Sequence, residues 1–92
     1  MNEVTYKWKV ARIMKKVIKQ KEKLEQIEDV SKGVRIIRQF INACEDVIKL
    51  NNKFMMALDD SEQAHEMRKN LIEMNKKVQE TINYAENYIF LQ

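Results

Sequence analysis

The sequence contains no proline and a single glycine, Gly33, among its 92 residues. Antiparallel strands need tight turns, and these turns depend on Gly, Pro and Asn-Gly pairs. A chain almost without such residues has little means of reversing direction between strands. The sequence therefore predicts an all-α fold, and its length predicts one domain that covers residues 1–92.

Cysteine and histidine are almost absent too, with one copy of each, Cys44 and His65. A single cysteine excludes an intrachain disulfide and every paired-cysteine zinc motif. The pair Glu62 and His65 has the spacing of a di-iron helix motif, but that motif needs a second copy and further carboxylates. The sequence has no Gly-rich phosphate loop and no Ser-His-Asp set. We expect no enzymatic activity, no cofactor and no metal, with Cys44 in the core and His65 on the surface.

Long apolar runs are also missing. The longest, Phe54–Leu58, is far shorter than the roughly 20 residues that cross a bilayer. The first residues lack the apolar segment of a secretion signal. The lone cysteine fits a reducing compartment. These absences predict a cytoplasmic protein with no membrane span.

What the sequence does have is an uneven distribution of charge. Eight of its seventeen Lys and Arg residues lie between Tyr6 and Leu24, where only Glu22 opposes them. The net charge of +3 therefore combines a strongly basic first segment with a mildly acidic remainder. This asymmetry favours an anionic partner.

Apolar periodicity predicts three helices at about residues 4–30, 34–58 and 61–89. In the first helix a heptad-like apolar stripe repeats through Val10 and Val17, and Met14 and Ile18 widen it. The second helix is apolar over more than half of its circumference, which suggests that it is central. Short connections then predict an antiparallel three-helix bundle. The alternative is a continuous rod formed by the second and third helices, which would have to dimerise.

The helix ends follow from a few capping residues. Gly33 could end the first helix in the left-handed conformation, or Asp29 or Ser31 could cap the second helix. Before the third helix, two pairs have the spacing of a capping box. They are Asp59 with Glu62, and Asp60 with Gln63.

The basic first helix is the first candidate binding site. Lysines along a helix can contact phosphates, and Tyr6 and Trp8 could stack on bases. The alternative is that these lysines only solvate the helix, while Tyr6 and Trp8 close one end of the core. The candidate residues for an anionic partner are Lys9, Arg12, Lys15, Lys16, Lys19 and Lys23.

The second candidate site consists of apolar and aromatic side chains. They exceed what one neighbouring helix can cover. Methionine suits adaptable contacts and tyrosine is common at interfaces. The candidate residues for an oligomer or partner interface are Ile36, Leu50, Met55, Met56, Tyr84 and Tyr88.

The sequence thus predicts a non-enzymatic protein-binding module, such as a small adaptor, regulator or inhibitor, with a homodimer as its expected state. The alternative is a DNA- or RNA-binding protein that uses the basic first helix without reading sequence, because lysine greatly outnumbers arginine there.

Overall fold

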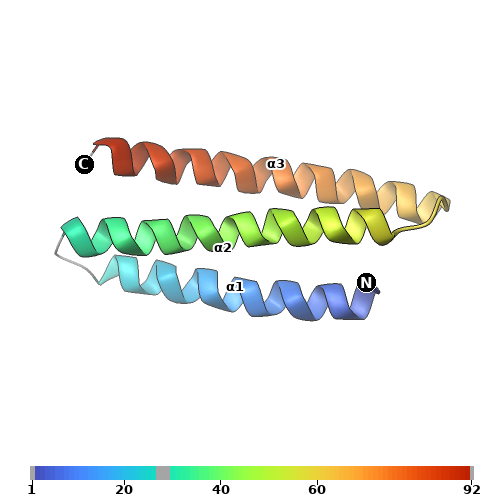
Figure 1. Ribbon diagram of the computed structural model, residues 1–92, viewed down its shortest axis with the longest axis horizontal. Helices are drawn as coiled ribbons and strands as arrows, with labels where there is room; N and C mark the ends of the chain where they lie inside the picture. Colours follow the sequence, from blue (N-terminus) through green and yellow to red (C-terminus); the bar gives the residue numbers. More distant parts are fainter. Residues whose placement is uncertain (1, 27–29, 92) are drawn as a thin grey trace.

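A computed structural model describes residues 2–26 and 30–91, without the side chains of residues 24, 30, 31 and 88–91. It contains three helices, α1 (Glu3–Glu25), α2 (Val30–Ala57) and α3 (Glu62–Leu91). Successive helices run antiparallel, with α2 between the other two (Figure 1). The molecule measures 50 × 23 × 15 Å between its outermost Cα atoms. The predicted antiparallel three-helix bundle is confirmed.

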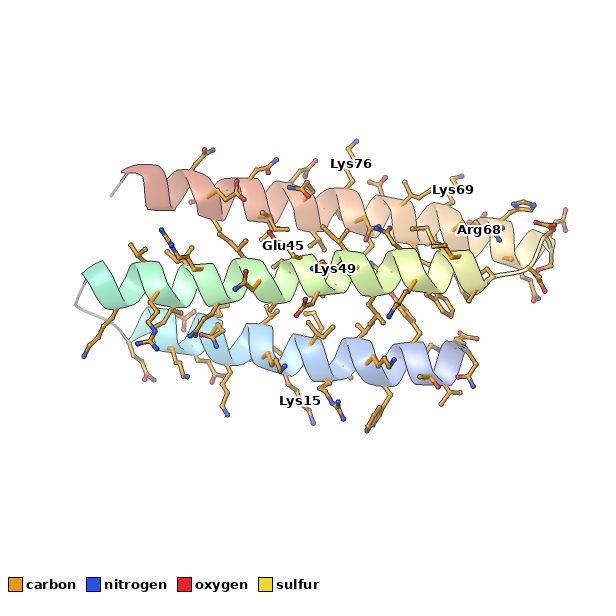
Figure 2. All side chains as sticks on the ribbon, viewed as in Figure 1. Lys15, Glu45, Lys49, Arg68, Lys69 and Lys76 are labelled. Carbon is orange, nitrogen blue, oxygen red and sulfur yellow. The ribbon has the colours of Figure 1, made fainter. Side chains whose placement is uncertain are left out.

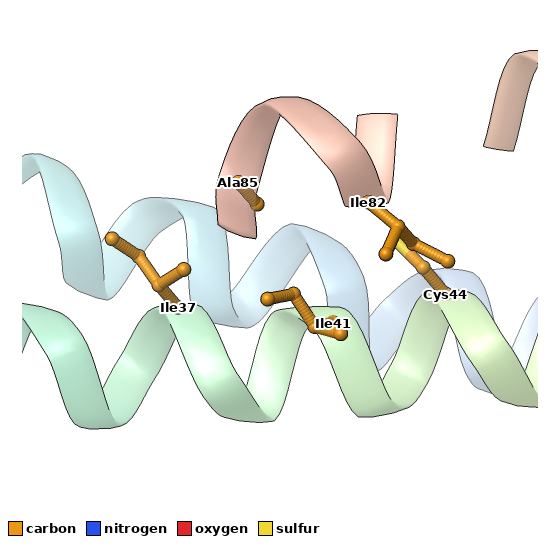
Figure 3. Close-up of a cluster of buried hydrophobic side chains, with 5 residues drawn as sticks. All are labelled: Ile37, Ile41, Cys44, Ile82 and Ala85. Carbon is orange, nitrogen blue, oxygen red and sulfur yellow. The ribbon is translucent and has the colours of Figure 1, made fainter. Parts of the chain in front are cut away.

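The central position of α2 follows from its wide apolar surface. It packs against both α1 and α3, whereas no Cα atom of α1 lies within 8 Å of one of α3 among the described residues. Ile37, Ile41 and Cys44 of α2 form a buried cluster with Ile82 and Ala85 of α3 (Figure 3). Two flanking helices therefore cover the surface that one neighbour could not.

The connection between α1 and α2 differs from the predicted one. Helix α1 ends at Glu25, and Gly33 lies inside α2 without a positive φ. The alternative in which Gly33 ends the first helix is therefore excluded, because the apolar pattern of α2 continues through it. Ser31 is also helical and cannot cap α2, while Asp29 lies outside the described residues.

The connection between α2 and α3 is a short turn, which excludes the continuous rod. Ser61, and neither predicted pair, caps α3: its Oγ accepts a hydrogen bond from the Ala64 amide at 3.1 Å. Asp59 instead accepts a bond from the Ser61 amide at 3.0 Å. Hydrogen bonding from the Ser61 side chain, and then from the Ser61 amide, lowers the pKa of Asp59. The Ser61 hydroxyl caps α3 because it reaches the third amide of the helix.

Arg68 also stabilises this connection, and it lies one helical turn after Ala64 in α3. Its guanidinium donates to the carbonyl oxygens of Leu58 at 2.8 Å and Asp59 at 2.7 Å. Carbonyl groups at the end of a helix have no partner within it. Arg68 thus supplies donors to the end of α2 and holds α3 against it.

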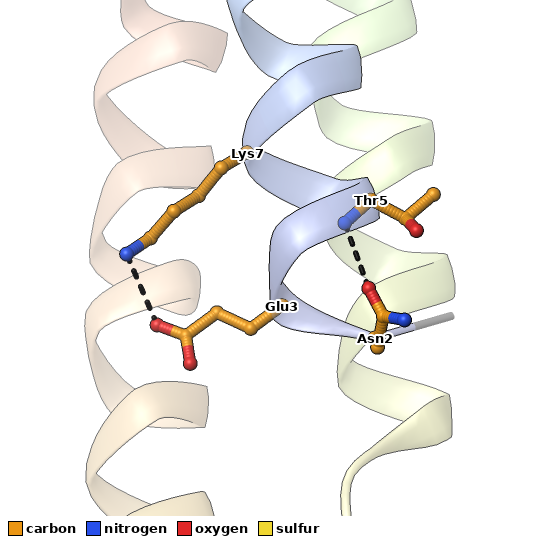
Figure 4. Close-up of polar contacts among 4 residues, drawn as sticks. All are labelled: Asn2, Glu3, Thr5 and Lys7. Atoms are coloured by element: carbon orange, nitrogen blue, oxygen red, sulfur yellow. Dashed lines mark hydrogen bonds and ion pairs between the residues drawn. The ribbon is translucent and has the colours of Figure 1, made fainter.

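The first turn of α1 is capped by Asn2. Its Oδ1 accepts a hydrogen bond from the Thr5 amide at 2.8 Å, and Lys7 pairs with Glu3 at 3.2 Å (Figure 4). Both members of that ion pair are more than half exposed, so it stabilises the helix by less than about 1 kcal/mol. The cap is the stronger determinant of where α1 begins.

Candidate binding surfaces on α1

Helix α1 is the least buried of the three. Its inner face, through Tyr6, Val10, Ile13 and Val17, is only half-buried, and none of its described side chains is fully buried. In contrast, α2 contributes most of the buried apolar residues. A helix at the edge of the bundle keeps much of its surface free for contacts.

The outward side of α1 carries large apolar side chains. We call Val4, Trp8, Met14 and Ile18 the outer stripe. Their exposed fractions are 78%, 63%, 40% and 52%. The prediction that Met14 and Ile18 widen the buried stripe is wrong, because at about 100° per residue they lie beyond the reach of α2. Trp8 is not part of the core, and the Arg12 guanidinium sits 4.5 Å from its ring centroid.

Tyr6, by contrast, joins α1 to the core. Its ring stacks on Phe54 of α2, with centroids 4.3 Å apart and planes 14° from parallel. Its hydroxyl donates a hydrogen bond to Asn51 Oδ1. Burial raises the pKa of this hydroxyl. Tyr6 therefore closes the end of the core and is not free to stack on a base.

Asn51 is the centre of a polar network that spans all three helices. Its side chain is completely buried, and its Nδ2 donates to Asn75 Oδ1 of α3 at 2.8 Å. Asn75 Nδ2 donates in turn to Asn52 Oδ1 at 3.1 Å. Sequence reasoning missed this network. The available signal was a polar residue within the apolar stripe of α2, four residues after Val47 and three before Phe54.

An open groove of about 530 Å³ runs between α1 and α2. Ile13 and Leu50 form its apolar floor. Four of its lining residues are cationic and one, Asp46, is anionic. The cations are Lys9 and Arg12 from α1 and Lys49 and Lys53 from α2. The structure thus joins two of the predicted anion-binding residues to two that the sequence analysis did not select.

The cations of the groove belong to a larger basic face. Helical geometry places Lys16, Lys19 and Lys23 on the same flank of α1 as Lys9 and Arg12. The polar stripe of α2 adds two arginines beyond the groove. The complete set, which we call the basic face, is exposed and contains Lys9, Arg12, Lys16, Lys19, Lys23, Arg35, Arg38, Lys49 and Lys53.

Among the described residues of α1 and α2 that helical geometry places on this face, two are acidic, Glu45 and Asp46. Nine basic and two acidic side chains give it a net charge of +7, so the rest of the chain carries −4. Within the described part of the chain, the one ion pair closer than 4 Å is Lys7 with Glu3, which lies outside the face. The cations of the basic face are therefore not neutralised by ion pairs at that distance.

The remaining predicted residues are spread over the molecule. Lys15 points away from α2, at the outer edge of α1 (Figure 2). Leu50 is buried, Ile36 and Met55 are half-buried, and Met56 and Tyr84 are 87% and 78% exposed. The side chain of Tyr88 lies outside the described residues. The predicted interface is therefore not a single surface in one molecule.

Cys44 and His65 lie where the sequence predicted. Cys44 is buried in the α2–α3 cluster, where burial and then the charge of Glu45 raise the pKa of its thiol. His65 is exposed beside Glu62 and Glu66. Among the described residues, no three His, Cys, Asp or Glu side chains gather as a metal site would require.

Comparison with models of protein families, with curated proteins and with solved structures gives no match. Within the described residues, no helix offers an apolar stretch of the length that a bilayer crossing demands. The outer stripe and the basic face are therefore the two surfaces of this chain that indicate a function.

Proposed function

We propose that this chain is a non-enzymatic binding module that acts by occupying the surface of another protein, with the outer stripe of α1 as its contact. The observation that carries the proposal is the exposure of Trp8 and Ile18 on a helix that already packs against α2 with its opposite side. Val4, Trp8, Ala11 and Ile18 have the i, i+4, i+7 and i+14 spacing with which a helix fills an apolar groove.

The charges around the stripe indicate the chemistry of the partner. By helical geometry Lys7 and Lys15 lie among the apolar side chains, and Arg12 and Lys19 lie beside them. All four are exposed. A second copy of α1 would bring like charges together, whereas an acidic rim around an apolar groove would complement them. The partner is thus expected to be a different, acidic protein surface.

The predicted homodimer rested on an apolar surface of α2 too wide for one neighbour. In the bundle α1 and α3 both cover that surface, so its width no longer requires a second copy. A homodimer stays a prediction, and it would use exposed residues such as Met56 and Tyr84. Light scattering during size-exclusion chromatography at high protein concentration tests it, and a monomer throughout would exclude it.

A pull-down from nuclease-treated native lysate tests the proposed function. The bait is compared with a Trp8→Ser, Ile18→Ser variant and with a control, Ile72→Ser, which removes an exposed apolar side chain from α3. We expect a stoichiometric protein partner with the wild type and the control, and its loss with the α1 variant. Equal capture by all three baits, or loss of every protein after nuclease, would contradict the proposal.

A further inference from the structure

We propose that the basic face is a second binding site, distinct from the outer stripe, and that it binds the phosphodiester backbone of nucleic acid without reading its sequence. The site combines the groove cations Lys9, Arg12, Lys49 and Lys53 with the basic residues further along α1 and α2. This inference does not depend on the protein partner, because the groove cations Lys9, Lys49 and Lys53 are not among the charges around the outer stripe. Arg12 and Lys19 border both surfaces.

The shape of the face fits a linear polyanion. On α1 the basic residues extend from Lys9 to Lys23, about 21 Å at the helical rise of 1.5 Å per residue. A second row on α2 runs alongside it, separated by the roughly 8–10 Å between packed helix axes. Two parallel rows of cations over this length can contact several consecutive phosphates.

The composition of the face favours nucleic acid over a lipid surface. Ile13 is half-buried and Leu50 is buried at the floor of the groove, so this face offers little apolar side chain for insertion between lipids. The exposed apolar residues of α1 lie on its outward side. The face therefore offers mainly electrostatic contacts, which suit a regular row of phosphates.

The same composition predicts that the contact does not select a sequence. Six of the nine cations are lysines, which bind phosphate as flexible point charges, and the three arginines are dispersed over both helices. Direct base recognition relies on bidentate contacts from positioned side chains. Of the two aromatic residues at this end of α1, Tyr6 is stacked on Phe54 and is unavailable for base stacking, and Trp8 has the Arg12 guanidinium 4.5 Å from its ring centroid.

Fluorescence anisotropy with a labelled 20-base-pair DNA duplex of arbitrary sequence, measured from 50 to 200 mM salt, tests the proposal. The variant Lys9→Gln, Lys49→Gln removes one cation from each side of the groove. The control Lys69→Gln, Lys76→Gln removes the same charge from α3, where both side chains point away from α2 (Figure 2). Circular dichroism checks that both variants remain helical.

We expect the wild type and the control to bind with affinity that falls steeply with salt. The groove variant should bind about tenfold or more weakly at 50 mM salt, and its slope of log affinity against log salt should be smaller by about 1.8, or 0.9 for each lost phosphate contact. A second duplex of unrelated sequence should bind equally well. An Ile18→Ser variant, which changes the outer stripe and leaves the contact between Trp8 and Arg12 in place, should keep wild-type affinity. This result would separate the basic face from the protein contact.

Three results would overturn the proposal. The first is no binding at 50 mM salt. The second is an equal loss in the control, which would mean that total charge and not the basic face determines affinity. The third is equally tight binding of polyglutamate or of phosphatidylserine vesicles, which would assign the face to an acidic protein or to a membrane surface.

Discussion

At the scale of single residues, Asn51 is the side chain that links all three helices and so constrains how they are aligned. A buried amide is stabilised only if its hydrogen bonds are satisfied, and Asn51 is satisfied by Tyr6 of α1 and Asn75 of α3. Any shift of α1 or α3 along α2 would leave the fully buried side chain of Asn51 without these partners. We infer that this network selects one register of the three helices.

Replacing Asn51 tests this role. We expect Asn51→Ala to lower the free energy of unfolding by about 2–4 kcal/mol, because it leaves the Tyr6 hydroxyl and the Asn75 carbonyl without partners and opens a small cavity. Asn42→Ala, on the exposed stripe of α2, is the matched control and should change stability by less than about 0.5 kcal/mol. Urea denaturation measures both. Equal effects of the two substitutions on the free energy of unfolding would show that the network contributes no more to stability than an exposed asparagine does.

Cys44 leads to a prediction about pH. In the unfolded chain a cysteine ionises near pH 8.5, whereas burial and Glu45 raise the pKa of the folded thiol. Between those two values the folded state retains a proton that the unfolded state releases. The contribution of Cys44 to stability is therefore complete below about pH 8.5 and declines as the pH rises towards the folded pKa, by up to about 1.4 kcal/mol per unit.

The matched variant is Cys44→Ala. Urea denaturation at pH 7, 8.5 and 9.5 should show wild-type stability falling more steeply with pH than that of the variant. The raised pKa of Tyr6 acts in the same direction at still higher pH, but it does so in both proteins. Parallel pH profiles for the two proteins would refute this account of Cys44.

At the scale of helices, Gly33 is the residue least suited to its position. It lies within α2 and has no positive φ. Among the described residues, a Cβ atom added there would meet no atom within 4 Å beyond its chain neighbours and the backbone of its own helix. Glycine inside a helix costs stability because the unfolded chain loses more conformational freedom when it orders. No described residue occupies the space that a side chain at position 33 would fill.

We therefore expect Gly33→Ala to raise the free energy of unfolding by about 0.5–1 kcal/mol. The reverse exchange at an exposed position of α1, Ala11→Gly, should lower it by a similar amount. Thermal denaturation followed by circular dichroism measures both changes. A destabilised Gly33→Ala protein would mean that this glycine has a steric or conformational role in the connection between α1 and α2.

The helices themselves could be predicted because their apolar periodicity is strong and turn residues are scarce. Their ends could not be predicted as well, because several residues compete to cap them. Ser61, Asp59 and Asp60 all suit the start of α3, and only the geometry of the turn selects Ser61. For Gly33, the usual preference of glycine for helix ends was outweighed by continuous packing along α2.

At the scale of the whole molecule, the arrangement of charge is the main feature. The sequence indicated a basic first helix, but it could not show that α2 extends this surface with Lys49, Lys53 and two arginines. That information depends on how the two helices are rotated against each other. The same rotation turns Ile18 and Trp8 towards solvent, although a heptad pattern alone placed Ile18 near the core.

Helix α1 is consequently the edge at which both proposed contacts lie. Its inner side packs on α2, its outward side exposes apolar residues, and its flank forms half of the basic face. Helix α3 contributes to the core through Ile82 and Ala85 and to the register through Asn75. This division of roles predicts that partners protect α1 much more than α3.

Hydrogen–deuterium exchange of the protein, alone and bound to the partner recovered in the pull-down, tests this central claim most directly. The account predicts that binding slows amide exchange in peptides from α1, between residues 3 and 25, and leaves the exposed side of α3 around Lys69 and Lys76 unchanged. Protection confined to α3, or no change in α1, would contradict it.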